Sequence, residues 1–174
     1  MKLVALAATL LAVSAVASAD SLKATADKMG RQASVAIAHK DFKKFESTMH
    51  QYITSDFKYT DSGNSMSFEK MLAGMKQGLA MINITAASSR LLSFKEHGKS
   101  GTTYTTHRVM GTMTGADKKS HTLVAIGNSM DSWVKAGGSW KMSVMAWGKQ
   151  RMTLDGKPFN PMAGPPPTPA RGRK

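Results

Sequence analysis

The sequence predicts an α+β domain in which three N-terminal helices pack on a mostly antiparallel sheet of long strands. Up to about residue 82, apolar residues recur at spacings of three and four, which is typical of helices with one buried face. From Ile84 onward, apolar and polar residues alternate, as in half-buried strands. Near the end, Trp133 and Trp140 frame a Gly137-Gly138 pair that favours a tight hairpin between two such strands.

The first 19 residues are expected to be a cleaved export signal and not part of the fold. Lys2 gives the positive start, Leu3 to Val16 the apolar run, and Ala17-Ser18-Ala19 the cleavage site. The apolar run is shorter than the roughly 20 residues that a membrane span requires. We therefore expect a secreted or periplasmic protein, cut after Ala19, with no transmembrane segment after cleavage.

Two helices are predicted to meet at Lys40-Asp41. The first runs from Ser21 to about His39, and Asp41 is expected to cap the second. The apolar stripe of the first helix consists of Leu22, Ala26, Met29, Ala33 and Ile37. That of the second consists of Phe42, Phe45, Met49, Tyr52 and Ile53.

A short strand and a third helix are predicted next. The period changes to two between Ser55 and Asp61, and Asp61-Ser62-Gly63-Asn64 is a strong turn signal. Ser67 then opens the helix. Its apolar stripe consists of Phe68, Met71, Leu72, Met75, Leu79 and Ile82.

Four long strands are predicted at residues 84–97, 102–114, 122–135 and 139–152. The last two run about 14 residues each, longer than the usual 3–10, so they must coil or bend. Gly127 and Gly148 are the expected bend or bulge positions. We place the domain at residues 20–156 and expect the Pro-rich basic tail, 157–174, to be disordered.

The order of these elements resembles the nuclear-transport-factor-2-like superfamily, the cone fold of SnoaL-like polyketide cyclases and ketosteroid isomerase. Lys40-Asp41-Phe42 looks like the break between the first two helices of that fold. Residues 57–64 with 67–69 are similar to its first strand, turn and third helix, and residues 132–142 to its closing hairpin. The resemblance implies a strongly curved sheet forming a cone with a pocket, helices at its mouth, and frequent dimers through the sheet.

The resemblance implies no particular reaction, because the fold hosts isomerases, cyclases, dehydratases and non-catalytic members. Asp61 lies near the position of the general-base carboxylate of ketosteroid isomerase; alternatively, it caps its own turn. Asp131 lies near the position of that enzyme's protonated oxyanion donor; alternatively, it faces water. The isomerase tyrosine of the first helix has no counterpart, since no Tyr occurs between Leu22 and His39.

The expected pocket is apolar with a few polar groups. Thirteen methionines remain once Met1 is removed from the 14; Met suits varied apolar ligands, but ordinary core packing at helical and strand spacing is the first reading of them. No thiol is available, and the five histidines form no close metal-binding pair, so we expect neither a metal nor a cofactor. The expected pocket-lining residues are Tyr52, Tyr59, His107, Trp133 and Trp147.

The formal net charge of +13, or +12 without Lys2, favours anionic partners. The sequence lacks the signatures of nucleic-acid-binding modules and so disfavours a nucleic-acid partner. Three functions stay open. The preferred one is a secreted domain that binds a small apolar or amphipathic molecule. The others are a cofactor-independent isomerase, cyclase or dehydratase with Asp61 as base, and a basic module that docks on an anionic polymer or membrane.

Overall fold

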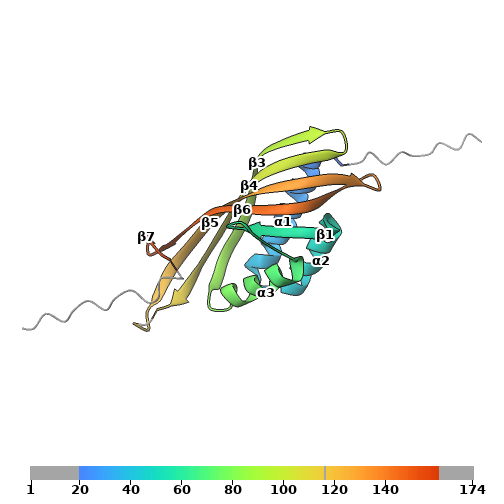
Figure 1. Cartoon of the computed structure of the whole chain (residues 1–174). Helices are drawn as coiled ribbons and strands as arrows, with labels where there is room; N and C mark the ends of the chain where they lie inside the picture. Colours follow the sequence, from blue (N-terminus) through green and yellow to red (C-terminus); the bar gives the residue numbers. More distant parts are fainter. Residues whose placement is uncertain (1–19, 116, 161–174) are drawn as a thin grey trace, which may run out of the picture.

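A computed structural model describes residues 20–115 and 117–160; the predicted signal and residues 161–174 of the tail lie outside this range. Three helices and seven strands form an α+β domain with a curved, open sheet, which confirms the predicted fold class (Figure 1). The helices are α1 (Leu22–Ala38), α2 (Phe42–Tyr52) and α3 (Phe68–Leu79). The strands are β1 (Ile53–Asp61), β2 (Asn64–Met66), β3 (Asn83–His97), β4 (Ser100–Thr114), β5 (Ser120–Ala136), β6 (Ser139–Leu154) and β7 (Lys157–Pro158).

Side-chain caps begin all three helices. The Asp41 carboxylate accepts from Lys44 N at the start of α2, as predicted, and the hydroxyls of Ser21 and Ser67 do the same for α1 and α3. Lys40 takes a positive φ of 52°, which breaks the chain sharply between α1 and α2. Ile53 was predicted on the stripe of the second helix, but it is the first residue of β1, in keeping with its β-branched side chain.

The sheet order is β2-β1-β6-β5-β4-β3, with β7 added to β6. The pairing of β1 with β6 is parallel and the others are antiparallel. The three-residue β2 was not predicted. The chain also stays in the sheet beyond residue 156, because Lys157 and Pro158 pair with β6 at the start of the segment that was expected to be disordered.

The hairpin between β5 and β6 has the predicted form. Gly137 and Gly138 have φ values of 58° and 83°, which glycine adopts without strain, and Ala136 pairs with Ser139 across the turn. The predicted bulge also occurs. Gly127 pairs with Gln150 and Ser129 with Trp147, so β6 has one residue more than β5 in this interval, at Gly148 and Lys149.

The hydrophobic core lies between the helices and one face of the sheet, which we call the inner face. Trp133 and Met142 are paired on this face and are 1% and 0% exposed. Leu22 of α1, Phe45 and Met49 of α2, and Phe68 and Leu72 of α3 pack in the same buried cluster. The opposite, outer face of β3–β6 carries Met130 and Val134, which are exposed. None of the described helices is both long and apolar enough to cross a bilayer.

Candidate functional site

A polar cluster interrupts the apolar core on the inner face. Ser129 and Asp131 alternate with Met130 on β5, so they point to the same side as Trp133. Pairing between β4 and β5 sets Thr103 opposite Asp131 and Thr105 opposite Ser129. All four of these polar side chains are buried, and Asp131 is only 1% exposed. Since buried polar groups are costly unless they are bonded, their bonds decide what this cluster can do.

A chain of hydrogen bonds leads from α1 into the cluster. The Ser34 hydroxyl donates to Ser89 Oγ (3.1 Å), Ser89 Oγ lies 2.9 Å from His107 Nδ1, and His107 Nε2 lies 2.9 Å from Ser129 Oγ. Ser89 accepts from Ser34 and is therefore free to donate to Nδ1. This arrangement assigns the proton of a neutral His107 to Nε2, which then donates to Ser129.

Asp131 is held by a second set of bonds. Thr103 Oγ1 donates to Asp131 Oδ2 (3.0 Å) and accepts from the Trp133 indole N–H (2.9 Å). Burial raises the pKa of the Asp131 carboxyl to about 6, and the hydroxyls of Ser129, Thr103 and Thr105 counter part of that rise. Asp131 does not face water. Near neutral pH, this carboxyl is an acid that can both hold and release a proton.

His107 is stacked on Trp147, with the ring centroids 4.8 Å apart and the planes at 25°. Burial lowers the pKa of the His107 imidazole to about 4, so the ring is neutral at physiological pH. Gly127 makes room for the indole, because a Cβ at this position would lie 2.9 Å from Trp147 Cζ2. The three residues come from β4, β5 and β6, next to one another in the sheet.

Two buried polar atoms in this region have no hydrogen-bond partner among the described residues. They are Asp131 Oδ1, a potential acceptor, and Trp147 Nε1, a donor. The hydroxyls of Ser129 and Thr105 affect the Asp131 pKa, but neither makes a hydrogen bond of good geometry to Oδ1. Leaving a buried polar group unbonded costs about 1–3 kcal/mol, so each atom marks a place where a bound polar group would be stabilised.

Tyr59 and Asp61 lie at the margin of this cluster. In the parallel pairing, Tyr59 is opposite Met145 and Asp61 opposite Trp147, and the Tyr59 and Trp147 rings are 6.4 Å apart. Burial, and secondly the charge of Asp61, raise the pKa of Tyr59 to about 12, so this phenol stays protonated. The Asp61 carboxylate is partly buried and accepts a hydrogen bond from the Ser62 hydroxyl within its own turn.

The structure therefore brings several of the predicted site residues together and leaves one apart. His107, Asp131, Trp133 and Trp147 meet on the inner face, and Tyr59 borders them. Tyr52 is buried in the core, where its hydroxyl donates to Gln32 Oε1. Sequence reasoning missed the hydroxyl residues of the cluster, because Ser and Thr usually face solvent; they include Ser34 on helix α1 and Ser89, Thr103 and Ser129 on the strands.

A separate charged cluster lies where the β4–β5 turn meets the end of β6. His121 Nδ1 is 2.6 Å from Asp155 Oδ2, and its Nε2 is 2.9 Å from Asp117 Oδ1. The hydrogen bonds to Asp117 and Asp155 raise the pKa of His121. The sequence offered no sign of this cluster, since Asp155 is distant in the chain. Across residues 20–115 and 117–160, no three acidic, His or Cys side chains are arranged to hold a metal ion.

Two hollows open elsewhere among the described residues, and of the inner-face cluster only Thr103 contributes to their lining. One, of about 450 Å³, is lined by Lys95, Thr102, Tyr104 and Met130 together with Ser93, Phe94 and Thr103. The other, of about 190 Å³, lies near Trp140 and Lys141 at the start of β6. Neither hollow is lined by His107, Asp131, Trp133 or Trp147. Tyr59, Met71 and Met145 are partly buried against the core.

Comparison with known proteins shows what this chain resembles. No family model and no curated protein matches the sequence. Solved structures match the fold. One is a protein of Kribbella flavida (TM-score 0.54, 10% identity, 74% of this chain and 91% of the other). Another is a conserved protein of Planctomyces limnophilus (TM-score 0.53, 16% identity, 71% of this chain and 92% of the other).

A third match is named “Putative Scytalone Dehydratase” and comes from Novosphingobium aromaticivorans (TM-score 0.53, 11% identity, 74% of this chain and 84% of the other). At these identities the likeness shows the fold alone. The chain has the cone-shaped α+β fold of nuclear-transport-factor-2-like proteins, as the element order predicted.

Proposed function

We propose that this protein binds a small, mainly apolar molecule with hydroxyl or carbonyl groups on the inner face of the sheet. The observation that carries the proposal is the pair of unbonded buried atoms, Asp131 Oδ1 and Trp147 Nε1. They lie on neighbouring strands, and Trp147 pairs with Ser129, two residues from Asp131. The backbones of such diagonal positions are about 7–8 Å apart, and the Trp147 indole reaches from there towards Gly127, so a ligand that bonds to both atoms must be elongated.

The surroundings of these atoms support an apolar ligand. Tyr59, Met71 and Met145 are partly buried beside the core, and methionine side chains adapt to ligands of different shape. The stacked rings of His107 and Trp147 offer a flat surface at the same place. A cluster of this kind, apolar with few polar groups, is typical of small-molecule sites.

We further propose that the protein acts outside the cytoplasm, secreted or in the periplasm, after removal of residues 1–19. The charged start, the apolar run and the Ala17-Ser18-Ala19 site support this location. N-terminal sequencing of the protein from a periplasmic extract or culture medium should begin at Asp20. A first residue of Met1 in the mature protein would contradict the proposal.

Ligand binding is tested with two probes that differ only in their polar groups: naphthalene and a naphthalenediol with one hydroxyl on each ring. At pH 8, calorimetry should show the diol binding about tenfold more tightly, because its hydroxyls bond to Asp131 and Trp147. Trp147→Phe and Asp131→Asn should each reduce that advantage, whereas the matched Trp140→Phe should keep it. Equal binding of both probes to the unmodified protein would overturn the proposal.

An enzyme of isomerase, cyclase or dehydratase type is the second candidate. It is favoured by the raised pKa of Asp131, whose carboxyl would be a neutral hydrogen-bond donor below about pH 6, and by the partly buried Asp61 opposite Trp147 in register. Asp61 would then act as the general base. Mass spectrometry of a bound substrate over time would show loss of water or rearrangement. An unchanged rate in Asp61→Asn would remove Asp61 from this role.

A further inference from the structure

The outer face of the sheet carries positive charge only. On β3 to β6 the acidic residues are Glu96 and Asp131. Glu96 accepts from Leu22 N of α1, and Asp131 is buried on the inner face, so neither faces outward. Lys141, opposite Val134, also lies on this face, but it is partly buried and its ammonium donates to Gln51 O. The exposed cations on the outer face include Arg90, Lys95, Arg108 and Arg151. All four are exposed, and none forms an ion pair within the described part of the chain.

Strand pairing gathers three of these cations at one level of the sheet. Arg108 on β4 pairs with Ile126 on β5, and Ile126 pairs with Arg151 on β6. The two arginines are thus separated by one strand, or about 10 Å. Arg90 on β3 pairs with Thr106, two residues from Arg108, which corresponds to about 7–8 Å. The planar guanidinium groups suit bidentate contact with carboxylate or other oxyanions.

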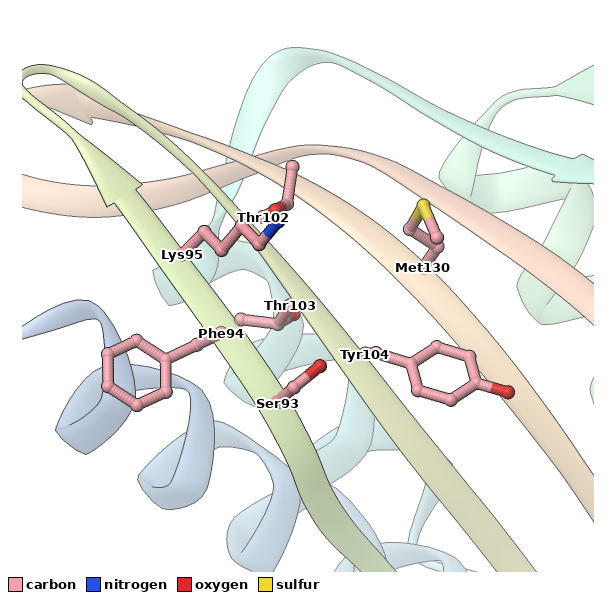
Figure 2. A pocket seen from close by; sticks show the side chains of 7 residues that line it. All are labelled: Ser93, Phe94, Lys95, Thr102, Thr103, Tyr104 and Met130. Carbon is pink, nitrogen blue, oxygen red and sulfur yellow. The ribbon is translucent and has the colours of Figure 1, made fainter.

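A hollow lies farther along the same face, with Tyr104 in its lining four residues from Arg108 on β4. Its outward-facing residues include Lys95, Thr102, Tyr104 and Met130, as Figure 2 shows, with Tyr104 and Phe94 pointing in opposite directions from the two strands. Tyr104 is 37% and Met130 59% exposed. Around them the outer face is rich in hydroxyl groups, which Ser93, Thr102, Thr106 and Ser132 supply. The region thus offers an aromatic ring, hydroxyls and cations along one side of the sheet.

We propose that the outer face binds an acidic polysaccharide. The apolar face of a sugar ring packs on exposed aromatic side chains such as Tyr104, and sugar hydroxyls bond to Ser and Thr hydroxyls. Carboxylates along the polymer then pair with Arg90, Arg108 and Arg151. The distance along β4 from Tyr104 to Arg108 is about 13 Å, so the polymer would span several sugar units.

Charge also argues against a second copy of this chain as the occupant. Two such faces in contact would place eight cations, four from each copy, opposite one another with no acid between them. Like charges across an interface cost several kcal/mol, roughly, and suppress that partner. An anionic polymer instead neutralises each cation, with an affinity that falls as the salt concentration rises.

The test measures binding of the full mature chain to polygalacturonate in about 50 mM salt, with neutral dextran as the uncharged probe. Polygalacturonate should bind and dextran should not. The triple variant Arg90→Gln, Arg108→Gln, Arg151→Gln should weaken binding about tenfold, since each exposed ion pair contributes roughly a 1.4- to 5-fold gain in affinity. Tyr104→Ala should weaken it as well, without a change in charge.

The control is a triple variant with the same loss of charge on the helices, Lys28→Gln, Arg31→Gln, Lys43→Gln, all exposed positions. It should bind polygalacturonate within about twofold of the unmodified protein, because these three cations lie outside the proposed surface and their long-range attraction is screened by salt. Equal losses in both triple variants, or no binding by the unmodified protein, would overturn the proposal. So would tighter binding to a thymidine homopolymer or to phosphatidylglycerol vesicles than to polygalacturonate.

Discussion

His107 and Trp147 stack although one whole strand separates the strands that carry them. His107 is on β4 and pairs with Gly127 of β5, and Trp147 is on β6. The ring centroids are nevertheless only 4.8 Å apart. Gly127 permits this contact, because it has no side chain in the space that the indole occupies. The size of one residue on the middle strand thus determines how His107 and Trp147 can pack.

Gly127→Ala should displace Trp147 and destabilise the fold. A Cβ would lie 2.9 Å from Cζ2 and 3.2 Å from Nε1 of the indole, which is too close without movement. Overpacking of this kind costs typically about 1–3 kcal/mol. Urea unfolding measures the loss, and near-ultraviolet circular dichroism reports the Trp environment. Gly74→Ala is the control: it has open space around it on helix α3 and should stabilise the protein by about 0.5–1 kcal/mol.

Replacing His107 should remove a pH dependence of stability. The pKa of His107 is about 4 in the folded chain and 6.5 ordinarily, so below pH 6.5 the unfolded chain binds a proton that the folded chain does not. Stability should therefore fall by up to about 3 kcal/mol between pH 6.5 and 4 because of this residue. In His107→Gln that fall should be absent, as measured by urea unfolding at several pH values. The exposed His97→Gln is the control, and an unchanged pH profile in His107→Gln would contradict the buried site.

Asp131→Asn should produce the opposite pH dependence. The pKa of Asp131 is raised from 3.8 to about 6, so the folded chain holds a proton that the unfolded chain has lost between those values. The ionised carboxyl then costs stability above pH 6, and the cost disappears as the pH falls to about 4. At pH 8 the variant should be more stable by up to about 3 kcal/mol, and the difference should shrink towards acid pH. An exposed control, Asp56→Asn, should show no such trend.

Thr103→Val should be among the most destabilising single changes on the inner face. The Thr103 hydroxyl accepts from Trp133 Nε1 and donates to Asp131 Oδ2, and all three groups are buried. Its loss leaves a donor and a carboxyl without partners, at about 2–5 kcal/mol. Thermal unfolding at pH 7 measures the effect. Thr102→Val, the exposed neighbour on the outer face, should change stability by less than about 0.5 kcal/mol. Equal effects in the two variants would contradict the network.

Much of the fold follows from local sequence signals. Asp41 and Ser67 cap helices because their side chains bond to the first free backbone N–H groups. Gly137 and Gly138 make the hairpin because it needs positive φ at both positions. Helix capping and tight turns depend on only a few neighbouring residues, so they can be predicted from a single sequence.

The site is harder to predict because it depends on register between distant strands. Ser89 lies opposite His107 because the irregularity between Leu91 and Ser93 shifts the pairing of β3 with β4 by one residue. The parallel pairing of β1 with β6, which places Asp61 beside Trp147, joins segments that are far apart in the chain. On β5, the apolar Met130 and the charged Asp131 suggest that the face with Met130 is buried. The opposite is observed: Asp131 is buried, because it shares a face with the large apolar Trp133.

In the proposed binding site, the unbonded Oδ1 atom of Asp131 would make the choice of ligand depend on pH. Below about pH 6 the carboxyl is neutral and can donate its proton, so a ligand carbonyl is the better partner. Above that value the carboxylate only accepts, and a ligand hydroxyl is preferred. Asp131 would thus prefer a ligand carbonyl in mildly acidic surroundings and a ligand hydroxyl in neutral ones, with no movement of the backbone.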